Sequence, residues 1–405
     1  MYPASNLTAP HPMTTPDGNP SISDWSLTPH KTHLNHGSYG SVPRAAQEVQ
    51  LQLKARMDAN PCTWFMGQYS AVAKARAQVA GFLGVDAGHT ALVLNASAGI
   101  SAVYNSLDFE HGAEIVTTSH AYGAVLHGAH RIARKHGGRV RIADVPLDAD
   151  AETVCALVLA EVSSRTALIV VDQITSATAR AFPVEAIARA AAPLGIPVLV
   201  DGAHAPGIVE SPVPDFEGFW VGNLHKFACA PRGTAALVCS GDRAAGLVPL
   251  IDSWGFPYRF PENFDHVGTQ DVTSWMAAHA SFDTIEERYG WGTFRSYAGG
   301  LCDYGASIIG DAFTAHTGED HSVEVGMPVG PLRLLRLPKG LATTHEDSHS
   351  VRELISERWD FETAVTTFAG EGFLRLSAHL YNSPSDYEAF AEKAVPGLVE
   401  LARST

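Results

Sequence analysis

Two residues that could do chemistry follow apolar runs of the sequence, where buried strands are expected to end. Asp201 closes the run GIPVLVD, and Lys226 follows FEGFWVGN within the stretch GNLHKF (222–227). Lysine is almost never fully buried unless something pairs with it or uses it, and in a low-dielectric pocket its amine becomes a nucleophile. An acid at the end of a buried strand must meet a cation or a donor. Asp201 therefore either caps the next turn or faces a protonated heteroatom of a ligand.

A third feature of this kind is the start of a predicted helix at ASAG (96–99), directly after the run TALVLN. Its small residues leave backbone N–H groups open to a phosphate, although they also fit an ordinary helix start. Ligands of parallel sheets bind at the carboxyl ends of the strands, so the acid, the lysine and the helix start share one edge. Pyridoxal 5′-phosphate needs an amine for its aldehyde, a carboxylate for its ring nitrogen and a cradle for its phosphate. We therefore predict this cofactor.

The elements that must position these groups form a regular alternation of short apolar runs and helical patterns. Strands are predicted at 90–95, 113–119, 139–145, 166–174, 195–203, 216–223 and 233–240, with helices such as 70–84, 121–137 and 183–195 between them. This order predicts an α/β domain with a mainly parallel seven-stranded sheet that helices cover on both faces.

Three regions follow from the same patterns. Residues 1–24 are rich in Pro, Ser and Thr and predict a flexible arm. We assign residues 25–285 to the large α/β domain. Residues 286–405 carry two further strands and a helix, at 330–338, 372–381 and 350–358, and predict a smaller α+β domain.

The composition restricts the class of protein. The 28 Lys and Arg against 43 Asp and Glu give a net charge of -15, without a basic run, so nucleic acid is not an expected partner. No apolar stretch reaches membrane-spanning length, and no membrane is expected. The five cysteines are scattered without CxxC spacing, which fits a reducing cytoplasm. His127 and His130 favour a solvated helix face over a metal site, so no metal is predicted.

With these motifs in place, the chain resembles the class V branch of the fold-type I pyridoxal-phosphate enzymes over nearly its whole length. Within that branch it looks like the isopenicillin N epimerase-like group, which includes C–S lyases. The motifs that carry the resemblance are LNHGSYGSVP (34–43), LNASAG (94–99), TTSHAYGA (117–124), DQITSATARAFPVEAI (172–187), LVDGAHAPG (199–207), GNLHKF (222–227), APRGTAAL (230–237), GTQD (268–271) and LRLSAHLYN (374–382).

The resemblance implies a role for each matching residue around the cofactor. Lys226 becomes the Schiff-base lysine and the proton shuttle at Cα, Asp201 pairs with the ring nitrogen, and His204 reaches the ring hydroxyl. His120 stacks on the ring, with Tyr122 as an alternative. The phosphate is expected against Ser97, Ala98, Asn223 and His225, and against Thr269 of a second subunit, which implies a homodimer with shared active sites.

On the substrate side, the resemblance implies that Arg375 binds the α-carboxylate of an amino acid, a task suited to its planar fork. Asn35, His36 and Tyr39 are expected near the entrance. The alternatives are a surface arginine on a strand and a plain turn at HGSYG.

Two departures from the family pattern concern one loop. Ala179 stands where the family usually has glycine, and Gln173 stands where it often has histidine, so either Gln173 or Ser176 is the expected cofactor contact. Residues 303–405 contain no cysteine, which disfavours the persulfide route of cysteine desulfurases.

The predicted reaction is β-elimination from a cysteine S-conjugate, a C–S lyase activity, and the Ala-rich composition and Pro-rich start suit an enzyme of secondary metabolism such as antibiotic biosynthesis. Three alternatives share the scaffold: epimerisation with His36 or Tyr39 as a second acid/base, transamination, and decarboxylation coupled to oxidative deamination. A non-catalytic regulator is disfavoured because both Lys226 and Asp201 are present.

Overall fold

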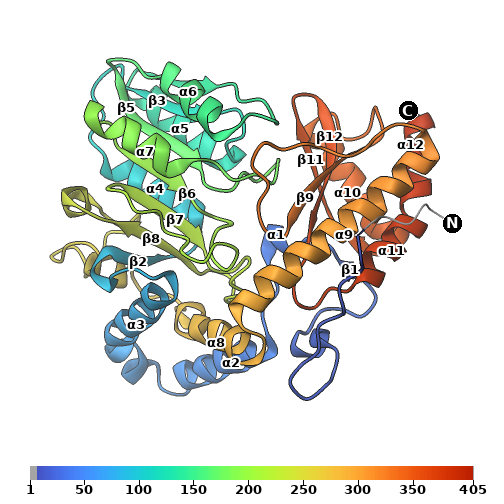
Figure 1. Ribbon diagram of the computed structural model, residues 1–405. Helices are drawn as coiled ribbons and strands as arrows, with labels where there is room; N and C mark the ends of the chain where they lie inside the picture. Colours follow the sequence, from blue (N-terminus) through green and yellow to red (C-terminus); the bar gives the residue numbers. More distant parts are fainter. Residues whose placement is uncertain (1–6, 405) are drawn as a thin grey trace. The chain divides into compact units, whose positions relative to one another are not determined.

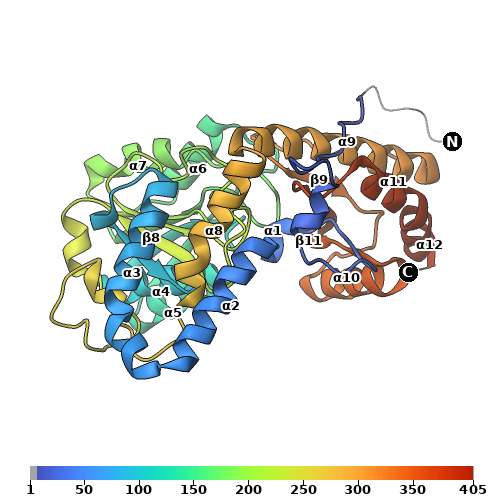
Figure 2. The same cartoon turned by 90° about the horizontal axis from the view of Figure 1, so that it is seen from below.

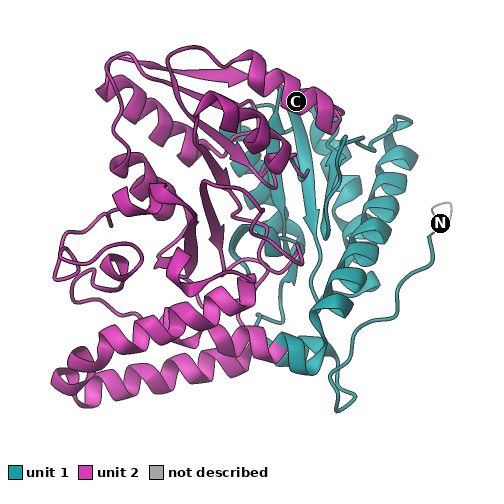
Figure 3. Ribbon diagram, turned by 60° about the vertical axis from the view of Figure 1, so that its left-hand side comes forward, with its two compact units in different colours: residues 1–41, 177–180, 285–405 teal, residues 42–176, 181–284 magenta. Residues whose placement is uncertain are grey.

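The computed structural model describes residues 7–404, which form two compact units (Figure 3). Unit 2 consists of Val42–Ser176 and Ala181–Thr284. Unit 1 holds the described residues up to Ser41, the short segment Ala177–Arg180, and the chain from Ile285 onward. Residues 25–41 and 177–180, which the sequence analysis assigned to the large domain, therefore belong to the smaller unit.

Unit 2 is built on a seven-stranded sheet in the order β2-β8-β7-β6-β5-β3-β4. Strand β8 runs antiparallel to both of its neighbours, and all other pairs are parallel. The strands are β2 (Thr90–Val93), β3 (Glu114–Thr118), β4 (Arg139–Ala143), β5 (Thr166–Asp172), β6 (Val198–Asp201), β7 (Phe219–Asn223) and β8 (Ala235–Cys239). All seven predicted strands are present, which confirms the α/β fold class.

Helices cover both faces of this sheet. Figure 2 shows α6 and α7 on one side and α4 and α5 on the other. The rings of Phe82 on α3 and Phe282 on α8 are stacked. The helices are α2 (Arg44–Ala59), α3 (Pro61–Leu83), α4 (Ala96–Ser106), α5 (Gly123–Lys135), α6 (Ala151–Ala160), α7 (Val184–Ala191) and α8 (Thr273–Arg288). Because both faces are covered, strands β2, β3, β6, β7 and β8 are buried along their whole length.

Unit 1 contains a three-stranded antiparallel sheet in the order β11-β12-β9, as an α+β domain predicts. Its strands are β9 (Leu332–Arg336), β11 (Ala364–Phe368) and β12 (Glu371–Ser377), and a separate parallel pair joins β1 (Thr32–His33) to β10 (Phe361–Glu362). Its helices, labelled in Figure 1, are α1 (His36–Tyr39), α9 (Trp291–Thr317), α10 (His345–Trp359), α11 (Pro384–Lys393) and α12 (Val395–Ser404).

The N-terminal segment differs from the predicted flexible arm. Residues 1–6 lie outside the described part of the chain, and most of residues 7–24 are exposed, but Ser21 and Asp24 are bound to other parts of unit 1. The Ser21 hydroxyl donates to the Leu380 carbonyl at 2.6 Å, and Asp24 accepts from the Tyr289 hydroxyl at 2.6 Å and from Arg288 at 2.7 Å. The prediction of a flexible arm rested on the scarcity of apolar residues in this segment. Hydrogen bonds to residues far along the chain also hold a segment in place, and composition gives no information about them. Among residues 7–404, no helix combines the length and the apolar character that a membrane-spanning helix needs.

Candidate active site

Lys226 and His204 meet at the carboxyl edge of the sheet in unit 2. The Lys226 amine lies 3.0 Å from Nε2 of His204, which follows β6 and is 2% exposed. The lysine itself is only partly buried. The loop around it is tightly packed, because a Cβ at Gly207 would lie 2.7 Å from the Phe227 carbonyl oxygen. The structure thus holds a primary amine and an imidazole side by side at the predicted edge.

Asp201 ends β6 and is 3% exposed. One carboxylate oxygen accepts the Ala203 N–H at 3.0 Å, so Asp201 does cap the following turn. Burial raises the pKa of the Asp201 carboxyl, while the Ala203 N–H and the nearby Lys226 charge oppose that rise. The turn therefore provides one hydrogen bond to the Asp201 carboxylate. Burial still leaves the negative charge of this carboxylate poorly solvated.

Asp172, which the sequence analysis did not single out, lies next to Asp201. It ends β5, pairs in register with Asp201, and is also 3% exposed. Burial raises the pKa of the Asp172 carboxyl well above its usual value, and the Asp201 charge raises it further, while the Tyr122 N–H opposes this. Asp172 also follows a buried apolar run, so the criterion that selected Asp201 would have found it.

The predicted phosphate cradle is tied to the strand that precedes Lys226. Asn223 on β7 accepts the Ala96 N–H at 2.8 Å, and Asn95 accepts the Ala98 N–H at 2.9 Å. Ser97 between them is exposed. A Cβ at Gly99 would come within 2.7 Å of Val221, so only glycine lets α4 approach β7 this closely. Asn223 thus holds the start of α4 in place, and the Ser97 side chain at that start is exposed to solvent.

His225 points its Nδ1 at the Thr234 carbonyl, 3.2 Å away. Burial, reinforced by the Lys226 charge, lowers the pKa of His225 to about 4, so the ring is neutral near pH 7. Its Nδ1–H donates to the carbonyl, and Nε2 is then an acceptor. An anion could bind at Nε2 only if the ring gained a proton that its surroundings disfavour.

His120 and Tyr122, the two candidates for stacking on a cofactor ring, differ in their surroundings. His120 is 2% exposed, its Nε2 lies 2.8 Å from the Val145 carbonyl, and its ring meets Phe182 edge-on. The Tyr122 side chain is 47% exposed. The His120 ring is therefore fixed in place, whereas the backbone of Tyr122 is the part that contacts Asp172.

The loop with the family departures divides between the two units. Gln173 in unit 2 donates to the Pro212 carbonyl and accepts from the Trp220 indole, both at 2.9 Å, so both ends of its amide have protein partners. Ser176 is partly buried. Ala179 in unit 1 has φ of 52°, in the left-handed region that favours glycine, which explains the family's preference there.

Arg375 lies on β12 in unit 1 and is 3% exposed, so it is not a surface strand arginine. Its guanidinium donates to the Ser38 hydroxyl at 3.0 Å and to the Asn35 side chain at 3.4 Å. Ser38 in turn donates to Asn35 at 2.7 Å, and Asn35 donates to the Thr363 carbonyl at 3.0 Å. The structure thus joins Arg375 to the predicted entrance loop through neutral oxygen acceptors.

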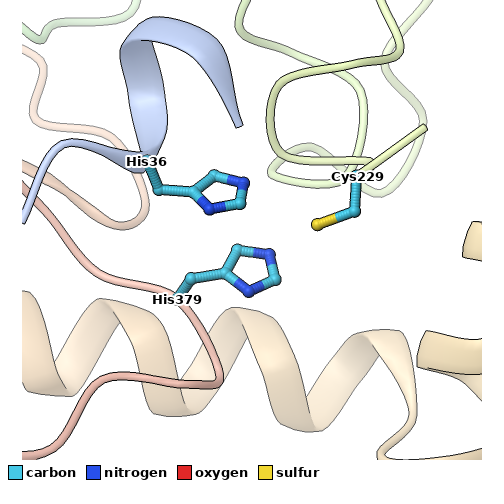
Figure 4. A group of neighbouring side chains, drawn as sticks. All are labelled: His36, Cys229 and His379. Atoms are coloured by element: carbon cyan, nitrogen blue, oxygen red, sulfur yellow. The ribbon is translucent and has the colours of Figure 1, made fainter. Parts of the chain in front are cut away.

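His36 belongs to the same loop and lies in an aromatic cluster. Its ring stacks on His379 with centroids 4.0 Å apart (Figure 4), and its Nδ1 lies 3.0 Å from the Tyr381 hydroxyl. His36 and His379 are 2% and 0% exposed, whereas Tyr39 is 63% exposed. His379 and Tyr381 were not predicted as site residues, although both stand in the quoted motif LRLSAHLYN.

Thr269 is exposed, and most of residues 248–259 are exposed too, whereas residues 260–267 between them are buried or half-buried. Between residues 248 and 258 the exposed apolar side chains are Val248, Leu250, Ile251, Trp254, Phe256 and Tyr258. His127 and His130 are exposed on α5.

The sheet order of unit 2, with the amine and the carboxylates at its carboxyl edge, defines the large domain of a fold-type I enzyme. The chain belongs to the aminotransferase class-V family, whose model matches residues 43–311. An isopenicillin N epimerase of Streptomyces clavuligerus is 28% identical over 401 residues, covering 92% of this chain and 98% of the relative. A hercynylcysteine sulfoxide lyase of Schizosaccharomyces pombe is 23% identical over 388 residues, covering 90% and 94%.

Solved structures share the fold. The enzyme C-DES, with glycine covalently linked to its PLP cofactor, has a TM-score of 0.76 and 17% identity, covering 94% of this chain and 100% of that one. The cysteine desulfurase CsdA of Escherichia coli has a TM-score of 0.73 and 18% identity, covering 94% and 97%.

Proposed function

We propose that this protein is a pyridoxal-phosphate enzyme that cleaves a C–S bond of a cysteine S-conjugate by β-elimination. The observation that carries the cofactor proposal is the Lys226 amine beside His204, at the sheet edge where Asp201 is buried. A protonated ring nitrogen against Asp201 would compensate for the burial that raises the pKa of this carboxyl. Family membership and a structural neighbour with PLP support the same cofactor.

The cofactor, when bound, supplies an electron sink for the negative charge that develops at the substrate Cα. Asp201 would hold the proton of the ring nitrogen, and His204 would donate to the ring hydroxyl. Ser97 at the start of α4 would bind the phosphate, because the N–H groups of Ala96, Ala98 and Gly99 already have acceptors within the chain. His120, whose Nε2 lies 2.8 Å from the Val145 carbonyl, would flank the ring.

On the substrate, Arg375 binds the α-carboxylate. Its guanidinium then donates to the charged carboxylate oxygens in place of the neutral oxygens of Ser38 and Asn35. Lys226 as a free amine removes the proton from Cα. The electron pair of that C–H bond then forms the Cα–Cβ double bond as the Cβ–S bond breaks, and the sulfur leaves as a thiolate. Protonation of the thiolate and hydrolysis of the remaining enamine give a thiol, pyruvate and ammonia.

The choice of β-elimination among class-V reactions is supported by relatives named as sulfur-processing enzymes. They include the hercynylcysteine sulfoxide lyase and an L-cysteine desulfhydrase-like protein of Epichloe uncinata, 26% identical over 300 residues. The competing candidate is epimerisation, which the similarity to isopenicillin N epimerase favours. It requires a second acid on the other face of Cα, and the buried His36–Tyr381 pair is the proposed donor.

The test offers S-alkyl cysteines and unsubstituted amino acids to the purified yellow protein and follows the products by mass spectrometry. We expect pyruvate, ammonia and the free thiol in equal amounts. Stereochemical inversion without fragmentation would establish the epimerase. An aldehyde with carbon dioxide, or an amino group passed to a keto acid, would overturn the lyase in favour of oxidative decarboxylation or transamination.

We also propose that the protein is a homodimer with shared active sites. Trp254 and Phe256 are 86% and 77% exposed, and monomeric proteins rarely expose such side chains in one continuous segment. Thr269 lies 13 residues after Phe256 and is also exposed, as a contact to a partner's phosphate requires. A second copy would cover both features.

A further inference from the structure

The first two turns of α10 carry two exposed histidines, His345 and His349, which are four residues apart. Residues at this spacing lie on the same side of a helix. Their Nε2 atoms are 3.2 Å apart. We propose that this pair binds one divalent cation of the late first transition row, such as Ni²⁺, Cu²⁺ or Zn²⁺, at a site separate from the proposed catalytic residues.

The distance between the two nitrogens suits a shared cation. Such cations bind imidazole nitrogen at about 2.0–2.1 Å. Two nitrogens at that distance from one cation and 3.2 Å from each other make an angle of about 100° at the cation, between the square-planar and tetrahedral values. The nitrogens therefore need no rearrangement of the helix backbone to bind the same ion.

The ring orientation points the same way. The ring centroids are 4.6 Å apart and the ring planes are inclined by 85°. Rings that pointed at each other head-on would have centroids separated by the nitrogen–nitrogen distance plus two ring radii, which is clearly more than 4.6 Å. The two nitrogens are therefore offset from the line that joins the ring centroids, an arrangement in which both can bind one cation that lies beside this line.

The helix start is arranged to tolerate a cation. The positive end of a helix dipole disfavours positive charge by about 0.3–1 kcal/mol. Glu346 and Asp347 lie in the first turn and offset this effect. Asp347 and Thr344 also form a reciprocal capping box, which fixes the backbone that carries the two histidines. Both rings are thus presented from an ordered turn.

The residues HEDSH (345–349) match the spacing of the zinc-protease motif, but the site lacks the parts of a catalytic centre. A catalytic zinc has three protein ligands in a cleft. Both histidines are exposed, and over residues 7–404 no third His, Cys, Asp or Glu completes a ligand group with them. We therefore assign cation binding with water as the remaining ligand, without hydrolytic activity.

Calorimetric titration of the full-length protein with Ni²⁺ tests the proposal. Wild type and the variants His345→Ala, His349→Ala and His11→Ala are compared, because His11 is exposed in the same unit and has no other histidine within four residues in sequence. We expect one site in wild type and in His11→Ala, and at least tenfold weaker binding in each of the other two. All three substituted positions are on the surface, and circular dichroism checks that the helices are retained.

Electron paramagnetic resonance with Cu²⁺ provides a second measurement. Coupling to two equivalent nitrogens is expected in wild type, and to one in either variant of the pair. Unchanged Ni²⁺ affinity in both His345→Ala and His349→Ala, or coupling to a single nitrogen in wild type, would overturn the proposal.

Discussion

Asp172 and Asp201 stand side by side as the last residues of β5 and β6, paired in register and each 3% exposed. Two buried carboxylates this close cannot both carry a charge cheaply, and burial raises the pKa of each. The folded protein without cofactor therefore holds protons in this pair at pH values where the unfolded chain has released them. A positive charge bound beside the two carboxylates would be stabilised. The raised pKa values also make the free energy of unfolding depend on pH.

The first prediction concerns that dependence. Because the folded pKa of the Asp172 carboxyl is raised, its contribution is most favourable below about pH 4, the unfolded value, and is lost as pH rises through the folded value. Asp172→Asn removes the charge and keeps an acceptor for the Tyr122 N–H. Urea unfolding of the cofactor-free protein at pH 5 and pH 8 should show a smaller loss of stability in the variant, and an equal loss would contradict the pairing.

The second prediction tests the lysine. Lys226→Ala should lose the yellow absorbance, and in wild type borohydride reduction should fix the cofactor mass on the peptide that contains Lys226. Lys74→Ala, an exposed lysine on α3, is the matched control and should behave as wild type. Recovery of the modified peptide elsewhere in the chain would show that another lysine holds the cofactor.

The third prediction concerns the carboxylate site. Arg375→Lys keeps the charge but cannot reach two acceptors with a planar fork, so KM should rise about 10- to 100-fold, as expected for losing a charge-assisted hydrogen bond of about 1.5–3 kcal/mol. Steady-state kinetics with the amino acid that is turned over gives this number. Arg336→Lys, on the neighbouring strand β9 and more exposed, should leave KM unchanged. A similar KM for both variants would remove Arg375 from the substrate site.

The fourth prediction follows from the backbone of the loop after β5. Ala179 has φ of 52°, which costs a non-glycine residue about 1–2 kcal/mol. Ala179→Gly should raise the free energy of unfolding by up to about 1 kcal/mol, because the gain is partly offset by the greater entropy of glycine in the unfolded chain. Ala177→Gly, two residues earlier and without positive φ, should instead destabilise the protein. Chemical denaturation of both variants measures the two signs.

The fifth prediction tests the dimer. Replacing Trp254 and Phe256 by serine should convert the protein to a monomer, measured by light scattering after size-exclusion chromatography. Met66→Ser on α3 removes another highly exposed apolar side chain, 89% exposed and outside the segment, and should leave the mass unchanged. If wild type itself elutes as a monomer, the proposed shared site is wrong.

The sequence predicted the large sheet well because most of its strands are buried on both faces and read as apolar runs, although the edge strand β4 is largely exposed or half-buried. Val198–Asp201 and Phe219–Asn223 are examples, and their ends correctly indicated where Asp201 and Lys226 lie. The family assignment was confirmed, whereas the roles of individual residues stay predictions.

Other features depend on contacts between residues far apart in the chain. Ser21 is ordered by a bond to Leu380, and the amide of Gln173 by Pro212 and Trp220, and no local pattern reports such partners. Asp172 could have been found from its position at a strand end, but the strand pairing that sets it beside Asp201 is known only from the fold.

The bond from Asn223 to the start of α4 has a consequence for how the site is assembled. Strand β7 leads directly into the loop of Lys226 and also holds the start of α4, where we propose that the phosphate binds. The amine and the proposed phosphate side are therefore positioned by the same strand, and a substitution that displaces β7 is expected to disturb both at once.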